Sequence, residues 1–276
     1  MNPLRQAILA TMSAVLPPNR WLARGRRRAP TDPPTFSLTF DDGPHPEHTP
    51  ALLDALAKWG QTATFFVIGR EAERYPALMQ RIVEAGHAIG NHTFTHGEPK
   101  TISEETFLNE IAETDRVLAP WLGPPTRWVR PPKGELTWPK LRGLWRINRT
   151  VALWNVDPRD YRMASADELV AWAKAYRPRH GDIVLLHDRV AAAAQIVNAL
   201  GEAWVFYTWR SVPLDHWLDL TGAPTSTPAP SPPSSGEKVG GRGQALSNAS
   251  ESKTTNGHHS ERSAPSLPKT ETRRPN

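Results

Sequence analysis

Short apolar runs alternate with amphipathic helical patterns along the middle of the chain. Runs rich in β-branched and aromatic residues favour strands, and seven of them occur: SLTF at 37–40, ATFFVI at 63–68, AIGN at 88–91, RWVR at 127–130, VALWNV at 151–156, DIVLLH at 182–187 and WVFYTW at 204–209. Helical patterns separate most of these runs. Repeated alternation of strand and helix predicts an α/β fold with a parallel sheet, and seven short strands favour an irregular barrel.

The helical segments carry start and stop signals. Thr49 and Pro50 predict the N-cap and the first residue of one helix, which Gly60 ends. Pro76 opens a second helix, which ends at Gly86. The remaining predicted helices run from about 101–103 to 118, from a capping box at 165 and 168 to about 176, and over 191–200.

Composition changes sharply after residue 221. The segment 222–276 is rich in proline, serine and glycine, and it has too few apolar residues to bury a core, so the sequence predicts a disordered tail. Across the 276 residues the apolar fraction is 38%, which is enough for one sizeable domain. The predicted division is a basic N-terminal segment at 1–34, a folded domain at 35–221 and the tail at 222–276.

The formal net charge of +5 comes from the two ends of the chain. Residues 1–30 contain six arginines and no acidic residue, and residues 222–276 contain seven Lys or Arg against four Glu. The body between them is mildly acidic, so the charge does not indicate a specific nucleic-acid-binding groove. The basic ends instead suit contact with a membrane or another anionic surface.

The N-terminus is only weakly similar to an export signal. MNPLRQAILATMSAVL places one arginine before a short apolar stretch, but no small-x-small cleavage site precedes Pro17 and Pro18, and the stretch is too short and polar to span a bilayer. An amphipathic helix followed by an arginine-rich linker explains it equally well. The sequence therefore leaves the compartment open between cytoplasm and cell envelope, and it leaves the oligomeric state open.

Titratable residues end five of the predicted strands or stand in the loops that follow them. In parallel α/β folds the chemistry gathers on loops at the carboxyl ends of the strands, so these side chains are expected on one face. Taken singly, each motif also fits a structural role, as a turn or a buried histidine, and the inference rests on their combination. The residues concerned are Asp41 and Asp42, His92 and His96, Arg130, Asp157 and Asp160, and His187.

The spacing of His92 and His96 puts two imidazoles on one side of a helical turn, which suits a small divalent cation. The chain has no cysteine, so a metal ion must be bound by nitrogen and oxygen. Two histidines and one carboxylate leave positions open for water and substrate, as catalysis requires. Because neighbouring side chains on a strand diverge, one of Asp41 and Asp42 can bind the metal while the other acts as a base. His187 arrives from another strand and is placed to act as a general acid.

In this order the motifs resemble the polysaccharide deacetylase family, which is also called the nodulation-deacetylase homology domain and carbohydrate esterase family four. The similarity covers about residues 35–210. Its blocks are TFDDGP at 39–44, TATFFVIG at 62–69, GHAIGNHTFTH at 86–96, RPPKG at 130–134, Asp157-x-x-Asp160 and LLH at 185–187.

The resemblance implies a distorted (β/α) barrel of about seven parallel strands, with 35–221 as its catalytic domain. The implied activity is hydrolytic removal of N-acetyl groups from N-acetylglucosamine units of peptidoglycan, chitin or chitooligosaccharide. The implied cofactor is a divalent metal, usually zinc, with cobalt or other ions sometimes serving. The implied roles are Asp41 as general base, Arg130 as its partner, His187 as general acid, Asp160 as the residue that tunes it, and Asp42, His92 and His96 as metal ligands.

Two positions depart from the family pattern. Lys133 stands where an aromatic residue is usual, and Tyr161 stands where a tryptophan usually follows the second aspartate. Neither change removes a metal ligand, acid or base, so altered substrate preference is expected. Trp138, expected in the loop after Gly134, is the candidate for stacking on a sugar ring. The competing hypotheses are an O-acetyl esterase acting on xylan-type polymers and a non-catalytic carbohydrate-binding descendant of the fold.

Overall fold

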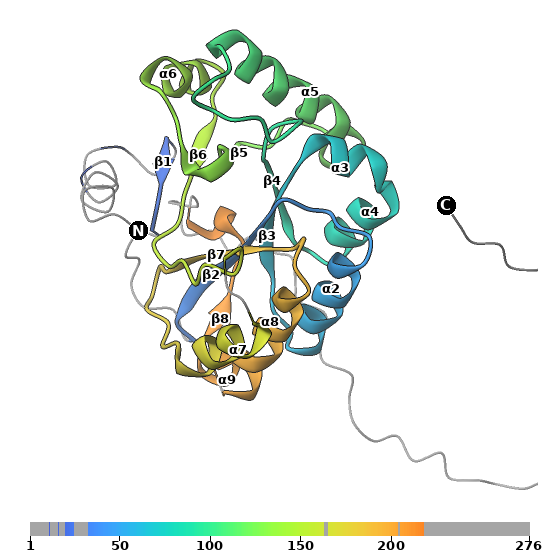
Figure 1. Cartoon of the computed structure of the whole chain (residues 1–276), viewed down its shortest axis with the longest axis vertical. Coiled ribbons are helices and arrows are strands. Elements are labelled where there is room, and N and C mark those ends of the chain that lie inside the picture. The colour runs from blue at the N-terminus through green and yellow to red at the C-terminus, as the bar shows by residue number, and fades with distance from the viewer. Residues whose placement is uncertain are drawn as a thin grey trace, which may run out of the picture. The chain divides into compact units, whose positions relative to one another are not determined.

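The computed structural model of the chain describes residues 11, 16, 20–24, 33–162, 165–203 and 205–217. Within them a parallel sheet has the order β1-β6-β5-β4-β3-β2-β7, and β8 pairs with β2 (Figure 1). The strands are β1 (Trp21–Leu22), β2 (Thr35–Asp41), β3 (Ala63–Val67), β4 (Ala88–Asn91), β5 (Trp128–Val129), β6 (Thr150–Ala152), β7 (Ile183–His187) and β8 (Arg210–Ser211).

The sheet is curled. Val156, in the segment that follows β6, forms a parallel bridge with Val184 of β7, so this side of the strand order approaches the strand at its other end. Two hydrogen bonds support this approach, from Val156 N–H to Ile183 O at 3.2 Å and from Leu185 N–H to Val156 O at 2.9 Å. The predicted distorted (β/α) barrel is therefore confirmed.

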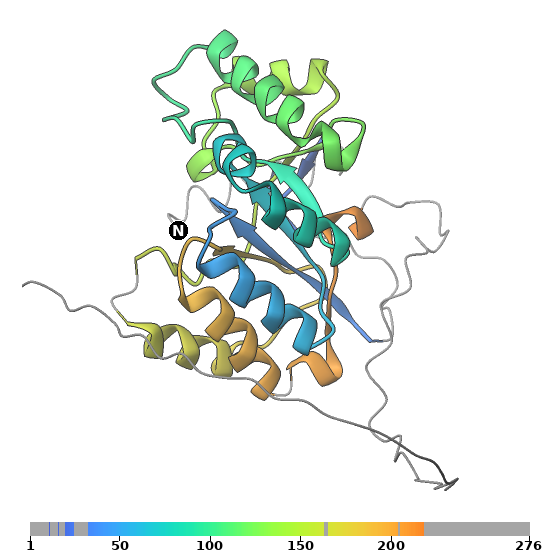
Figure 2. The ribbon, with the colours of Figure 1, turned by 90° about the vertical axis from the view of Figure 1, so that its right-hand side faces the viewer.

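Helices cover the outer face of the sheet. Figure 2 shows α2 and α8 side by side, and α7 packs against α8. The helices are α2 (His48–Lys58), α3 (Gly69–Arg74), α4 (Pro76–Glu84), α5 (Glu104–Leu122), α6 (Trp138–Arg146), α7 (Ala166–Ala175), α8 (Ala192–Glu202) and α9 (Val205–Thr208). Among the described residues, none of these helices has both the length and the apolar character needed to cross a membrane.

The alternation of side chains along β2 decides what faces the inside of the curled sheet. Phe36, Leu38 and Phe40 belong to the apolar core beneath the outer helices. Thr39 and Asp41 point to the opposite side, where both side chains accept hydrogen bonds from Arg130. The strand is buried on both faces, and its polar positions are the ones that lead to the site.

Most predicted helix starts are confirmed. Pro76 is the first residue of α4, Ser103 is the N-cap of α5, and the Ser165 side chain caps α7 by accepting from Glu168 N–H at 3.3 Å. The N-cap expected at Thr49 is wrong, because α2 begins at His48 and the Thr49 hydroxyl is used elsewhere.

The strand predicted at 204–209 is also wrong, since Val205–Thr208 is the short helix α9. Phe206 stacks on Phe36 at 6.4 Å between ring centroids and also meets Trp59 at 6.3 Å. A helical turn brings these aromatic contacts to the outer core, and they outweigh the strand propensity of the segment. The strand comes slightly later, where β8 pairs with the start of β2.

The ends of the chain and Trp138 are the remaining features that the sequence addressed. The predicted disordered tail at 222–276 lies outside the described residues, as does most of the basic segment 1–34, so both stay predictions. Trp138 is not in a loop, because it is the first residue of α6.

Candidate active site

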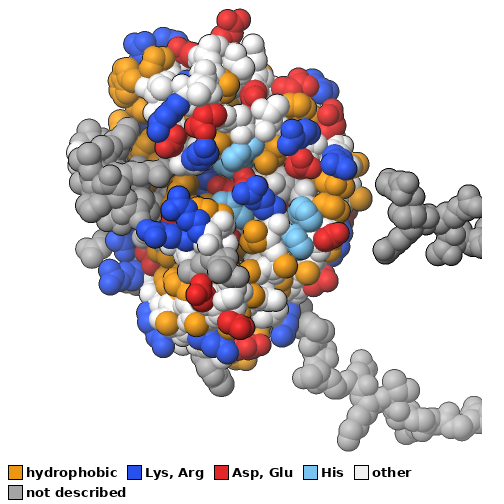
Figure 3. Space-filling view, viewed as in Figure 1, with side chains coloured by type: hydrophobic (Ala, Val, Ile, Leu, Met, Phe, Trp, Pro, Cys, Tyr) orange, Lys and Arg blue, Asp and Glu red, His pale blue; other side chains and the backbone are white. Residues whose placement is uncertain are grey.

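The seven residues to which the sequence assigned roles meet at the carboxyl ends of the strands. A cavity of about 360 Å³ opens there, and Figure 3 shows histidine and acidic side chains inside a hollow with Lys and Arg around it. Five of the seven line the cavity: Asp41, Asp42, His92, His96 and His187. The other two, Arg130 and Asp160, lie behind its wall and are hydrogen-bonded to Asp41 and His187.

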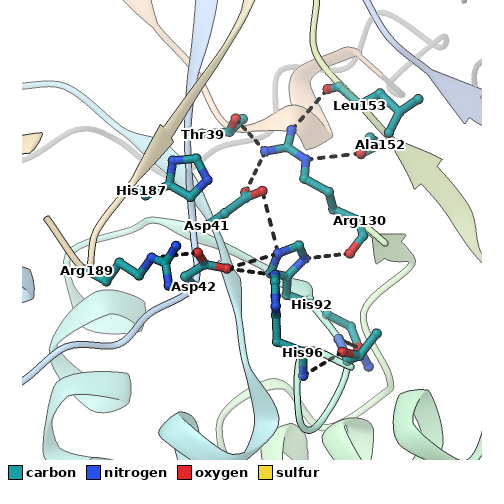
Figure 4. Close-up of polar contacts among 12 residues, drawn as sticks. Thr39, Asp41, Asp42, His92, His96, Arg130, Ala152, Leu153, His187 and Arg189 are labelled. Carbon is teal, nitrogen blue, oxygen red and sulfur yellow. Dashed lines mark hydrogen bonds and ion pairs between the residues drawn. The ribbon is translucent and has the colours of Figure 1, made fainter. Parts of the chain in front are cut away.

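Three of these side chains converge on one point. Asp42 Oδ1 lies 3.3 Å from His92 Nε2 and 3.2 Å from His96 Nε2 (Figure 4). Asp42 Oδ1 is buried and has no hydrogen-bond partner, which costs free energy unless a cation occupies the point. Among the described residues these are the side chains whose ligand atoms gather as a metal ion needs, all within 4.8 Å of one another. Two imidazole nitrogens and one carboxylate oxygen fit a divalent cation.

His92 is held in the orientation that metal binding needs. Its Nδ1–H donates to the backbone oxygen of Arg130 at 2.6 Å, so the lone pair of Nε2 faces Asp42. The His92 side chain is almost fully buried. Burial lowers the pKa of His92, but the nearby carboxylates of Asp41 and Asp42 raise it more, so the pKa ends above its ordinary value.

The helical turn predicted for His92 and His96 is wrong, because the segment after β4 is a loop. Thr93 and His96 adopt positive φ values of 67° and 59°. Asn91 Oδ1 accepts from Thr93 N–H at 2.9 Å, and Thr93 Oγ1 accepts from His96 N–H at 3.2 Å. This tight turn brings the two imidazole rings to 5.0 Å between centroids. The two histidines are therefore adjacent, as a helical turn would also have placed them.

Asp41 forms a buried ion pair with Arg130. Arg130 has no exposed surface, and its NH1 donates to Asp41 Oδ1 at 2.6 Å. The remaining guanidinium donors reach Thr39 Oγ1, Ala152 O and Leu153 O (Figure 4). A carboxylate and a guanidinium with this many hydrogen bonds compensate each other's burial. Asp41 Oδ2 is left facing the cavity, 3.7 Å from His92 Nε2.

His187 stands across the cavity and is bound to Asp160. Its Nδ1–H donates to Asp160 Oδ1 at 2.7 Å, and its backbone N–H donates to Asp160 Oδ2 at 2.7 Å. Burial lowers the pKa of His187, but the hydrogen bond and charge of Asp160 raise it, with help from Asp41 and Asp42. The net shift is upward, which favours the protonated imidazole. Tyr161, 42% exposed, meets the His187 ring edge-on at 5.2 Å.

Two further charged residues, Asp188 and Arg189, lie at the site just after β7, and none of the sequence motifs points to them. Arg189 Nε forms an ion pair with Asp42 Oδ2 at 2.9 Å, which leaves Oδ1 for a metal ion. Asp188 is fully buried, and burial together with Asp42 and Asp41 raises its pKa to about 7. The available signal was the run His187-Asp188-Arg189, in which three consecutive titratable residues stand at the end of one strand.

The two residues that depart from the family pattern both lie at the cavity. Both Lys133 and Tyr161 line it, and Lys133, at a positive φ of 57°, pairs with Glu98. Trp138 is 59% exposed and packs edge-on against Trp145 at 5.8 Å, and it is not among the residues that line the cavity. The expectation that Trp138 stacks on a sugar therefore has no support from its position.

Comparisons with known proteins identify the family of the chain. Residues 28–147 match the model of the polysaccharide deacetylase family. A peptidoglycan-N-acetylglucosamine deacetylase of Bacillus cereus is 38% identical over 133 residues, and this chain spans about half of its length (48%). A chitooligosaccharide deacetylase of Sinorhizobium fredii is 33% identical over 210 residues, which cover 68% of this chain and 95% of that protein.

Solved structures agree. The peptidoglycan deacetylase PdaC from Bacillus subtilis superposes with a TM-score of 0.62 at 29% identity, over 68% of this chain and 92% of that chain. The similarity to known deacetylases thus covers both the sequence and the arrangement of the strands. This chain belongs to the polysaccharide deacetylase family, the carbohydrate esterases of family four.

Proposed function

We propose that the protein removes N-acetyl groups from N-acetylglucosamine units of peptidoglycan, chitin or chitooligosaccharide and releases acetate. The observation that carries the proposal is the convergence of Asp42 Oδ1, His92 Nε2 and His96 Nε2 beside an acid–base pair, Asp41 and His187. The names of the relatives support the substrate class, since they include deacetylases of peptidoglycan N-acetylglucosamine and of chitooligosaccharides.

Asp42, His92 and His96 would hold a divalent ion, for which we propose zinc, because imidazole and carboxylate ligands with open positions suit that metal. The chemistry that such an ion supplies is Lewis acidity, which polarises the acetamide carbonyl and stabilises the negative charge that develops on its oxygen. Arg189 takes the second oxygen of Asp42 and so limits that carboxylate to one ligand atom.

Asp41 and His187 divide the proton transfers. Asp41 Oδ2 takes a proton from the attacking water as the water oxygen bonds to the acetyl carbon. Arg130 holds the other oxygen of Asp41 and fixes the direction of Oδ2. His187 then gives the proton of Nε2 to the sugar nitrogen as the C–N bond breaks, and acetate and a free amine result. The raised pKa of His187 keeps that proton available.

The first test is acetate release from N-acetylchitooligosaccharides and from peptidoglycan, with acetylated xylan as the ester substrate. We expect release from an N-acetylated substrate, loss of release after chelation, and recovery when Zn²⁺ or Co²⁺ is added back. Release from xylan alone would mean an O-acetyl esterase. Full metal binding without release from any substrate would mean a carbohydrate-binding descendant, and release that survives complete metal removal would contradict the proposal.

The pH profile tests the pairing of Asp160 with His187. Activity should fall as the pH rises through the pKa of His187, because the general acid must be protonated. In Asp160→Asn burial would dominate and lower that pKa, so the alkaline limb of kcat/KM should move to lower pH. Asn can accept only one of the two hydrogen bonds from His187, so kcat should fall as well. A limb that stays in place or moves to higher pH would show that Asp160 does not tune the acid.

A further inference from the structure

Asp188 is a buried carboxyl group at the site that the proposed mechanism does not use. Its Oδ2 accepts from the Thr49 hydroxyl at 2.9 Å, and its Oδ1 has no hydrogen-bond partner. Its backbone N–H donates to Asp41 O at 3.1 Å, so the residue connects the end of β7 to the end of β2. Burying a carboxyl group beside the carboxylates of Asp41 and Asp42 costs free energy of folding, so a functional role for Asp188 would explain why it is there.

Those contacts lie on either side of the loop that joins β2 to α2 and begins with Asp42, and Asp188 also lies directly against that loop. Gly43 lies so close to Asp188 that a β-carbon at position 43 would be 1.8 Å from Asp188 Oδ2. Only glycine permits this approach, so the Asp188 carboxyl group forms one wall of the loop. Gly43 O also accepts from Ile68 N–H at 2.9 Å, which ties the other side of the loop to the end of β3.

Thr49, in helix α2, holds the loop after Asp42 from the side of the helix. While its hydroxyl donates to Asp188, its Oγ1 accepts from His45 N–H at 2.7 Å. The Thr49 hydroxyl therefore connects Asp188 to His45, which lies in the turn between Asp42 and α2. Asp42 itself adopts a left-handed φ of 75°, which a non-glycine residue holds only when its surroundings fix it.

We propose that Asp188 and Thr49 are positioning residues that direct the Asp42 carboxylate at the metal site and thereby set the affinity of the site for its divalent ion. The inference rests on the proposed function, because it assigns a metal ion to Asp42. Hydrogen-bonded partners of metal ligands typically change metal affinity by about 10–100-fold when they are removed. Here the effect passes through the backbone of the loop and not through a direct contact with a ligand atom.

The test compares Thr49→Val with Thr49→Ser and with Thr126→Val. Valine keeps the size of threonine but loses the hydroxyl, whereas serine keeps the hydroxyl. Thr126 is the matched control, because its hydroxyl also donates once, to Ile89 O, and accepts once, from Trp128 N–H, but it lies at the amino end of β5. The readouts are the Zn²⁺ dissociation constant by competition with a chelator, kcat and KM, and the unfolding midpoint of the metal-free protein.

We expect Thr49→Val to raise the Zn²⁺ dissociation constant by about 10-fold, the lower end of that range because the support acts through the backbone, and Thr49→Ser to bind Zn²⁺ as tightly as the unmodified protein. KM measured at saturating Zn²⁺ should change little, and the metal-free unfolding midpoint should fall no further than in Thr126→Val. A merely structural role would lower the midpoint and leave the dissociation constant unchanged. Equal Zn²⁺ affinity in Thr49→Val, Thr49→Ser and Thr126→Val would overturn the inference.

A second pair of variants covers the case in which Thr49→Val does not fold. Asp188→Asn keeps an oxygen that accepts from Thr49, and Asp188→Ala does not, so Zn²⁺ affinity should fall further in Asp188→Ala. Equal affinities in the two would overturn the inference. Failure of the proposed function gives a different result. If the unmodified protein binds Zn²⁺ but releases no acetate, the proposed deacetylase activity is rejected. The Zn²⁺ affinities of the variants still decide whether Asp188 and Thr49 position Asp42.

Discussion

Asp41→Asn should lower kcat for acetate release by about two to four orders of magnitude, the usual contribution of a general base. The reason lies in the pairing with Arg130. The amide oxygen of Asn must face Arg130 NH1, which donates to Asp41 Oδ1 at 2.6 Å, so the amide nitrogen takes the place of Oδ2 in the cavity. An amide nitrogen in that place has no free lone pair and cannot accept a proton from water.

The measurement is kcat on an N-acetylated oligosaccharide at saturating Zn²⁺, with the metal content of the variant determined in parallel. Asp54→Asn is the matched control, because Asp54 lies on the exposed face of α2 and pairs with Arg81. Metal content equal to that of the unmodified protein, together with the loss of kcat, would identify Asp41 as the base. A metal-replete Asp41→Asn protein that keeps full kcat would remove Asp41 from the mechanism.

Arg130→Met should reduce the free energy of unfolding by about 3–5 kcal/mol, the usual cost of breaking a buried ion pair from one side. Methionine fills much of the space, but it leaves the Asp41 carboxylate buried without its partner and removes the donors to Ala152 O and Leu153 O. For a domain of this size the melting temperature should fall by about 6–20 °C.

Denaturant unfolding of the metal-free protein measures the effect. The double variant Arg130→Met with Asp41→Asn serves as the control, because the Asn amide carries no charge that needs a partner. We expect the double variant to be more stable than Arg130→Met alone. If Arg130→Met unfolds at the same denaturant concentration as the unmodified protein, the ion pair contributes nothing to the stability of the fold.

The parallel sheet could be predicted because its strands are buried on both faces. ATFFVI and DIVLLH are nearly continuous apolar runs, as such strands require, and their ends fix the place of the chemistry. WVFYTW has the same composition, and its helix is decided by contacts with Phe36 and Trp59, which are distant in the sequence. The two-residue strand β1 pairs with β6, and so short a segment carries no periodicity of its own.

The members of the site could be predicted, but several of their supports could not. His92 and His96 follow a strand and were expected together, yet the turn that joins them depends on the side chains of Asn91 and Thr93. Asp188 follows His187 directly, and only the path of the chain beyond β7 determines that it turns toward Thr49 and Gly43. The positions of residues relative to the strand ends identify which residues meet. The direction of a side chain beyond the end of a strand depends on the path of the loop, which the sequence pattern does not determine.

The strand order has a consequence for the emergence of the chain from the ribosome. β2 lies between β3, which follows it closely in the sequence, and β7, whose Val184 lies 145 residues beyond Thr39 of β2. A nascent chain that has not reached Ile183 already contains Asp41 and the three candidate metal ligands, but it lacks its proton donor. Until β7 is synthesised, one edge of β2 stays open to strand pairing with other chains. Completion of the acid–base pair and closure of this vulnerable edge are therefore one and the same late event in folding.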